Sequence, residues 1–154
     1  MGTQSRTEKA IATFRSGYNC SQAVFHSYCD LFGVDGPKAK LIAAGFGGGI
    51  GGLQQTCGAV TGAVMLLGLH YYDENDVAGS KRNTYEKVRE FVAKFESKNE
   101  TAQCLDLLGV DLSTEAGRKK AKEEGLFEQK CEQYVIDVCN LLEDTILPRA
   151  DAPD

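Results

Sequence analysis

Paired cysteine motifs are missing from this 154-residue chain, although it contains six cysteines. No CxxC, CxxCH or CxxxC occurs, which excludes a zinc knuckle, a thioredoxin-type site and c-type haem attachment as local motifs. HExxH, GK[ST] and a Ser-His-Asp arrangement are also missing, and the two histidines, His26 and His70, are expected to pack or cap. A cysteine site in this chain must therefore be assembled in space from distant segments.

Basic runs and long apolar runs are missing as well. The formal charge is −5, and without a basic patch the chain is not expected to bind nucleic acid. The start, MGTQSRTEKA, lacks the apolar core of a signal peptide. The apolar run 59–69 covers about half a membrane span. We therefore expect a cytoplasmic protein without membrane insertion, in which cysteines serve as metal ligands, redox thiols or core residues rather than disulfides.

Alternating strand patterns do not occur, and helical periodicity runs through most of the chain. The sequence predicts an all-α fold: a single-domain bundle of about six or seven helices over residues 1–148, with a disordered tail at 149–154. Residues 113–124 form either a surface helix or a loop. The other expected helices cover residues 7–15, 20–32, 38–46, 54–71, 76–96, 101–109 and 128–141.

The bundle is expected to be organised around a buried central helix at about 54–71, which follows a Gly-rich loop at 45–52. Ordered glycines cost backbone entropy, so the loop must either turn through positive φ or be approached closely. The string GxGxxG occurs in it, but no strand precedes it, which argues against a nucleotide cradle. Gly58 and Gly62 give the central helix a small-residue face that a helix, a cofactor or a second copy of the chain can approach.

Four cysteines form the candidate site: Cys20, Cys57, Cys104 and Cys131. Three of them lie near predicted helix starts, where the helix dipole favours thiolate. Cys57 directly follows the Gly-rich loop and is expected to be the most reactive, so the redox chemistry is assigned to Cys57 and Cys20. Four thiolates can hold an iron–sulfur cluster or a zinc ion, or can cycle as thiol and disulfide.

Backbone N–H groups of the loop and the small-residue face are expected to approach the cofactor. The glycines concerned are Gly47, Gly48, Gly49, Gly51, Gly52, Gly58 and Gly62. The remaining two cysteines, Cys29 and Cys139, lie in apolar stripes and are expected to pack as small hydrophobic residues.

The segments GYNCSQAVF (17–25) and TCGAVTGAVM (56–65), followed by single cysteines at 104 and 131, resemble the C_GCAxxG_C_C family. The resemblance implies a redox-active protein of about this length, whose four family cysteines are those of the candidate site. A related module of split-Soret cytochromes is associated with an iron–sulfur centre, which implies a cluster here. Family members are often encoded near transporter genes, which implies a transporter as a partner.

Two classes of function remain open on the sequence. The first is a small cytoplasmic redox protein, an oxidoreductase or electron carrier, with an iron–sulfur cluster or dithiol chemistry favoured over zinc. The second is a non-catalytic helical adaptor, for instance of a transporter, whose cysteines pack in the core and whose small-residue face supports a homodimer. Thiols that react in the folded protein, or bound metal, distinguish the first class from the second.

Overall fold

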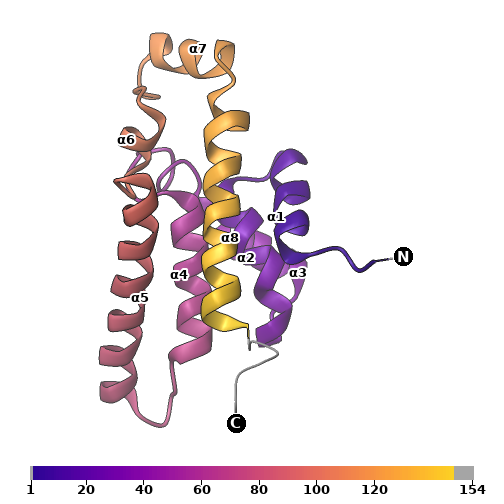
Figure 1. Cartoon of the computed structure of the whole chain (residues 1–154), viewed down its shortest axis with the longest axis vertical. Helices are drawn as coiled ribbons and strands as arrows, with labels where there is room; N and C mark the ends of the chain where they lie inside the picture. Colours follow the sequence, from indigo (N-terminus) through magenta and orange to yellow (C-terminus); the bar gives the residue numbers. More distant parts are fainter. Residues whose placement is uncertain (1, 148–154) are drawn as a thin grey trace.

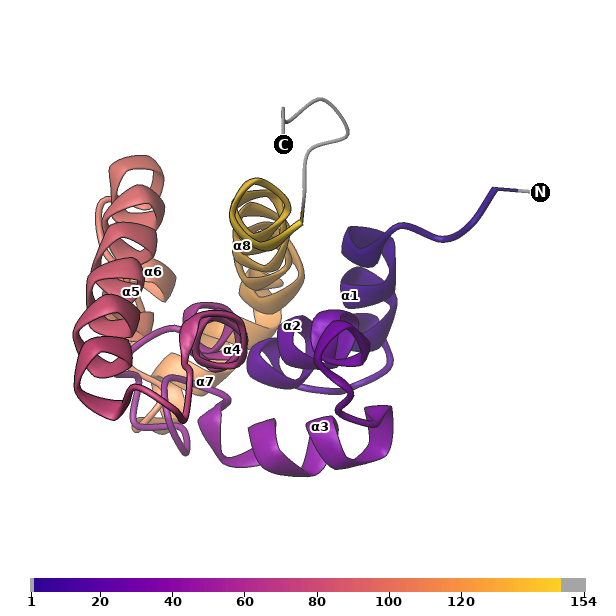
Figure 2. The same ribbon diagram turned by 90° about the horizontal axis from the view of Figure 1, so that it is seen from below.

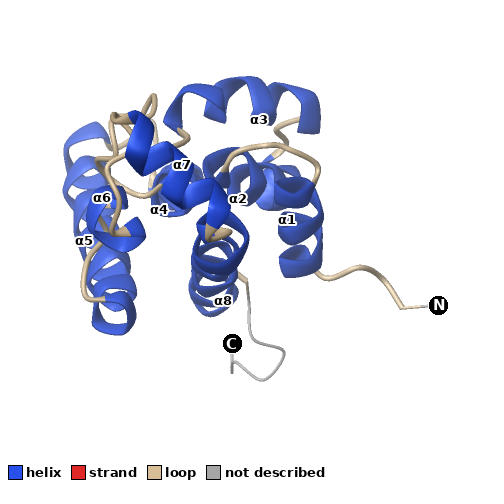
Figure 3. Ribbon diagram, turned by 90° about the horizontal axis from the view of Figure 1, so that it is seen from above, coloured by secondary structure: helices blue, strands red, loops and turns tan. Residues whose placement is uncertain are grey.

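The computed structural model describes residues 2–147 and contains only helices and loops there, apart from one isolated bridge between Thr56 and Gln103 (Figure 3). The all-α prediction is confirmed, with eight α-helices in these residues rather than six or seven. The tail expected at 149–154 lies outside the described residues. The α-helices are α1 (Arg6–Arg15), α2 (Cys20–Tyr28), α3 (Gly36–Ala43), α4 (Gly58–Tyr71), α5 (Val77–Asn99), α6 (Cys104–Leu108), α7 (Glu115–Glu123) and α8 (Glu132–Ile146).

Local capping explains where α2 begins and ends. The Asn19 side chain accepts a hydrogen bond from the Gln22 N–H, and the Gln22 side chain accepts one from the Asn19 N–H, so a capping box fixes the start. The α-helix ends at Tyr28 and continues as a 3₁₀ turn, η1 (Cys29–Phe32). Gly33 stops the turn in the left-handed conformation with φ of 72°.

The central helix is α4, which lies between α2 and α5 with α8 packed beside it (Figures 1 and 2). Its small-residue face is covered within the chain by α2. A Cβ atom added at Gly62 would lie 2.9 Å from the Ser21 carbonyl oxygen and 3.0 Å from the Val24 Cβ. The approach of another helix is therefore confirmed, and this face is not free for a second copy of the chain.

The main core lies between α2, α4, α5 and α8. From α5, Phe91 and Phe95 are buried in it. We define the main core by its largest fully buried side chains, which are Tyr28, Phe91, Phe95, Leu66, Leu67 and Leu142.

The start of the central helix was predicted wrongly. Residues 54–57 are not helical, because their backbone groups bond to a distant segment. The Cys57 N–H donates to the Ala102 carbonyl at 2.8 Å, and the Leu105 N–H donates to the Gln54 carbonyl at 3.1 Å. These bonds override local helix propensity and bring the start of α6 against the start of α4.

The chain before α8 also differs from the prediction of one helix over 128–141. Residues Phe127–Cys131 form a π-helical turn, η3, and α8 then runs to Ile146. Such turns interrupt the regular ladder and are frequent at functional sites. Between residues 2 and 147, no helix combines the length and apolarity needed to cross a membrane.

Candidate four-cysteine site

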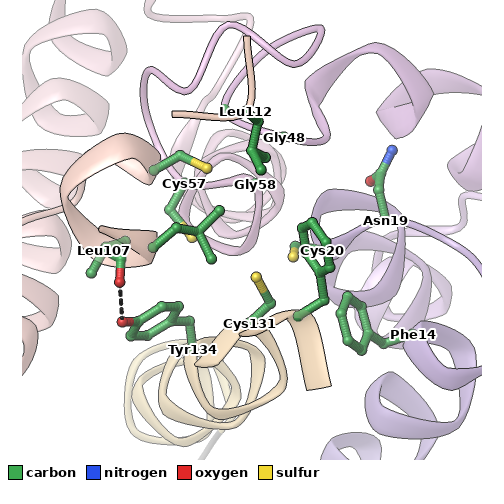
Figure 4. Close-up of a pocket in the computed structure, with 14 residues that line it drawn as sticks. Phe14, Asn19, Cys20, Gly48, Cys57, Gly58, Leu107, Leu112, Cys131 and Tyr134 are labelled. Atoms are coloured by element: carbon green, nitrogen blue, oxygen red, sulfur yellow. Dashed lines mark hydrogen bonds between the residues drawn. The ribbon is translucent and has the colours of Figure 1, made fainter. Parts of the chain in front are cut away.

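The four candidate cysteines line one pocket, with a cavity of about 170 Å³ (Figure 4). Each comes from a different element: Cys20 is the first residue of α2, Cys57 is the N-cap of α4, Cys104 opens α6, and Cys131 ends η3. The structure therefore brings together residues that are up to 111 positions apart in the sequence, at helix ends that meet at one end of the bundle.

The walls of the pocket are mostly apolar. Around the sulfurs lies a pocket cluster of buried side chains, which is separate from the main core and consists of Cys104, Leu108, Val110, Ala121, Leu126 and Cys131. The other residues that line the cavity include Phe14, Phe127, Leu107, Leu112 and Tyr134. A low-polarity pocket of this kind restricts water around any charged group bound between the sulfurs.

Cys29 and Cys139 lie elsewhere. Both are buried in the main core, with exposed fractions of 1% and 0%, and the Cys29 thiol donates to the His26 carbonyl at 3.2 Å. The structure thus separates the six cysteines into the same four and two that the sequence suggested.

Cys20 and Cys131 interact directly with each other. Their sulfurs face one another in the pocket (Figure 4), and a hydrogen bond joins the two groups. This bond, with the proton on Cys20, lowers the pKa of Cys131 and raises the pKa of Cys20 well above its usual value. Cys131 is the group that ionises first in this pair.

Cys57 differs from the prediction that it would be the most reactive thiol. Burial raises its pKa to about 12, although hydrogen bonds from the Ala59 and Val60 N–H groups act in the opposite direction. Burial likewise raises the pKa of Cys104 to about 11, with the nearby Cys131 adding to the shift and a hydrogen bond from Gln54 opposing it. The start of α4 does favour a thiolate, but desolvation of a side chain only 5% exposed is the larger effect.

Three of the seven candidate glycines reach the pocket: Gly48, Gly49 and Gly58. Gly48 and Gly49 have φ of 62° and 71°, and among the described residues nothing accepts a hydrogen bond from their N–H groups. A Cβ at Gly58 would lie 3.2 Å from the Cys20 Cβ. These positions let the backbone approach the sulfurs closely.

The other four glycines do not line the cavity. The N–H groups of Gly51 and Gly52 donate to carbonyls of the loop itself, at 2.8 and 3.1 Å, so they are not available to a ligand. Gly47 is needed because a Cβ there would collide with Asn19, and Gly62 is needed for the contact with α2. These four glycines serve the fold around the pocket.

Sequence reasoning missed several residues of the site. Tyr134 lines the pocket, and its hydroxyl donates to the Leu107 carbonyl at 3.0 Å, which ties α8 to α6 (Figure 4). Phe127 and Tyr134 lie four residues before and three residues after Cys131, and this helical spacing was the available signal. Phe14 comes from α1, and no sequence pattern connects it with the cysteines.

The fit of a metal group can be judged from the donors. No three Cys, His, Asp or Glu side chains between residues 2 and 147 are placed to hold one metal ion. A mononuclear zinc site is therefore not preformed. Four thiols are also the donor type of iron–sulfur clusters, which cysteines bind without any contiguous motif, and here they surround a cavity with apolar walls.

Fold and pocket together define an all-helical protein with a four-cysteine centre where helix ends meet. Residues 18–145 match the family model described as "Putative redox-active protein (C_GCAxxG_C_C)", and the chain belongs to this family. The matched range contains all six cysteines. Comparison with curated proteins and with solved structures returned no match.

Proposed function

We propose that this protein is a small electron-transfer protein in which Cys20, Cys57, Cys104 and Cys131 ligate an iron–sulfur cluster. The observation that carries the proposal is the convergence of four thiols from four elements on one apolar cavity. Membership of a redox-active family supports the same reading.

The cavity itself favours a cluster over a plain dithiol pair. A dithiol site needs two sulfurs in contact and no space between them, whereas here Cys57 and Cys104 face a cavity of about 170 Å³ in addition to the Cys20–Cys131 pair. Buried voids larger than a water molecule are few in a well-packed domain. A group held between the four sulfurs accounts for both the extra thiols and the space.

The chain's own residues would hold and shield the cluster, which supplies one-electron chemistry when bound. The apolar side chains of Leu108, Leu112 and Phe127 line the cavity and restrict water. The N–H groups of Gly48 and Gly49, which line the pocket, would donate hydrogen bonds to sulfur, an interaction that tunes the potential of such centres.

A second candidate function rests on the hydrogen bond between Cys20 and Cys131. In this function the Cys131 thiolate attacks an incoming disulfide and releases one of its sulfurs as a thiolate. Cys20, after losing its proton, then attacks Cys131 in the mixed disulfide. The products are a Cys20–Cys131 disulfide and two reduced thiols, so electrons and atoms balance.

The cytoplasm remains our proposed compartment, and the six free thiols of the structure are consistent with a reducing one. A redox partner, for example one associated with a transporter, is likewise a proposal that follows from the family resemblance. Self-association also stays a proposal, but the small-residue face from which it was expected is covered by α2. The adaptor reading is weaker than the redox reading, because packing alone does not require four thiols around a cavity.

The proposal is tested by measuring iron, acid-labile sulfide and the visible absorption spectrum of the full chain purified without oxygen. We expect iron and sulfide in near-equal amounts, with charge-transfer bands that bleach on reduction. Replacement of each pocket cysteine by alanine is expected to abolish the bands or make them labile. A colourless protein without iron, even after anaerobic reconstitution, would overturn the cluster proposal.

Cys29→Ala and Cys139→Ala are the matched controls, because they remove the same side chain from the main core. Both should retain iron and sulfide at wild-type levels. In the colourless case, the second candidate function predicts a Cys20–Cys131 disulfide after mild oxidation, detected by mass mapping, and its absence would leave the adaptor reading.

A further inference from the structure

Gln54 has an unusual position beside the four-cysteine site. It is only 6% exposed, and its φ of 56° places a non-glycine residue in the left-handed region. Such conformations cost free energy and persist where the surrounding structure holds them in place. The residue precedes Cys57 by three positions and is not helical.

Both polar atoms of the Gln54 side-chain amide make hydrogen bonds to one distant segment. Its Nε2 donates to the Val110 carbonyl at 2.9 Å, and its Oε1 accepts from the Leu112 N–H at 2.7 Å. The amide also hydrogen-bonds to the Cys104 thiol. One buried amide therefore connects the residues that precede α4 to a second segment and to a pocket sulfur.

The second segment, residues 110–124, is here called the roof segment. It lies between Gly109 and Gly125, which have φ of 72° and 61°, and it contains α7 at one end of the bundle (Figure 1). Within the described chain, two hydrogen bonds connect residues 110–121 to residues outside the roof segment, and both are made with Gln54. Next to Gly125, the Gln129 side chain donates to the Glu124 carbonyl at 3.0 Å.

The inner side of the roof segment is apolar and packs against Cys104 and Cys131. Val110 and Ala121 belong to the pocket cluster with Cys104 and Cys131, and Leu112 lines the cavity. The outer side of α7 is exposed and charged, and its Lys119–Glu123 ion pair stays within the helix. The roof segment is thus bound to the bundle by a small apolar contact and by the amide of Gln54.

We propose that Gln54 is a positioning residue that latches the roof segment over the four cysteines and thereby sets the solvent access of Cys104 and its neighbours. The inference deepens the proposed function and rests on it only for the identity of the group protected. Without the amide, the buried Val110 carbonyl and the half-buried Leu112 N–H lose their partners, and the segment opens between its two glycines.

The experiment measures alkylation rates of all six cysteines in the metal-free, reduced full chain with N-ethylmaleimide, mapped by mass spectrometry. Gln54→Leu introduces an apolar side chain of similar size and removes the hydrogen bonds of the side-chain amide. We expect labelling of Cys104 and Cys131 to accelerate by about tenfold or more, while Cys29 and Cys139 in the main core stay protected. Gln55→Leu is the matched control, because Gln55 is exposed and makes its hydrogen bonds through the backbone.

Gln54→Gly distinguishes the effect of losing the side-chain hydrogen bonds from the effect of relieving backbone strain at residue 54. It removes the amide but suits the positive φ, so a latch predicts the same acceleration as in Gln54→Leu, and wild-type rates would overturn the proposal. Unchanged labelling in Gln54→Leu, or equal acceleration of all six cysteines, would also overturn it. The measurement needs no cofactor, so accelerated labelling in a protein that never binds iron would retain the latch and reject the cluster.

Discussion

The main core and the pocket cluster differ in how completely the chain fills them. In the main core, large side chains such as Tyr28, Leu66 and Phe95 are fully buried between long helices. In the pocket cluster, Cys104, Val110 and other side chains retain exposed fractions of 3 to 9% beside an open cavity, except for Ala121. The difference teaches that the chain fills the main core by itself, while beside the pocket cluster it leaves a cavity that the proposed iron–sulfur cluster would occupy.

The largest expected effect compares matched leucines in the two regions. Leu66→Ala leaves a void among fully packed side chains, and the free energy of unfolding should fall by about 2–5 kcal/mol. Leu108→Ala, in the wall of the pocket, enlarges an existing cavity and should lower it by less. Urea unfolding of the metal-free proteins measures both values.

The same two variants should show the opposite order of effects in a second measurement, the rate at which visible absorption is lost in air. In protein that carries the proposed iron–sulfur cluster, Leu108→Ala admits water to the sulfurs and should speed the loss of the cluster's visible absorption in air. Leu66→Ala should leave that rate unchanged. If Leu66→Ala bleaches as fast as Leu108→Ala, the two regions are not independent.

A smaller effect compares glycines that serve the two regions. Gly62→Ala forces a methyl group against the backbone and Val24 of α2, and should lower the free energy of unfolding by about 1–3 kcal/mol. Gly51→Ala meets no neighbour but has φ of 58°, so it should cost about 1 kcal/mol from conformation alone. Thermal unfolding of the two variants checks the order, and an equal cost would mean that α2 and α4 separate easily.

How much of this could be predicted from the sequence depends on the range of the interactions. Local signals placed the helices well: Asn19 caps α2, and Asp76 caps α5. The four cysteines converged as expected, because helix starts and the family resemblance both marked them. The non-helical conformation of 54–57 was missed, since it depends on backbone hydrogen bonds to residues near 103. Gln54 was missed for the same reason.

The raised pKa of Cys57 could not be predicted from the sequence, because burial is a tertiary property. The sequence placed the start of the central helix at 54 rather than at Gly58, and the loop and α6 that cover the Cys57 thiol are distant in sequence. Of the glycines, only the roles of Gly48, Gly49 and Gly58 beside the pocket matched the expectation. Composition cannot separate glycines that contact a site from those that shape its loop.

The smallest expected effect concerns ionisation and leaves the fold intact. In the metal-free protein the Cys20 thiol donates to Cys131 and lowers the pKa of Cys131, while burial raises the pKa of Cys57 to about 12. Between about pH 7 and 9, around the ordinary range of a thiol, alkylation of Cys131 should therefore level off first, while alkylation of Cys57 stays slow and keeps rising with pH.

Cys20→Ala tests the cause of this order, because it removes the donor and leaves Cys131 in place. The alkylation profile of Cys131 should move to higher pH, since its thiolate loses the hydrogen bond that stabilised it. Cys29→Ala, a change in the main core, should leave the profile where it was. A Cys131 profile unmoved by Cys20→Ala would show that these two thiols do not act as a pair. The disulfide function would then lose its support, whereas the cavity shared by all four cysteines would continue to favour a bound cluster.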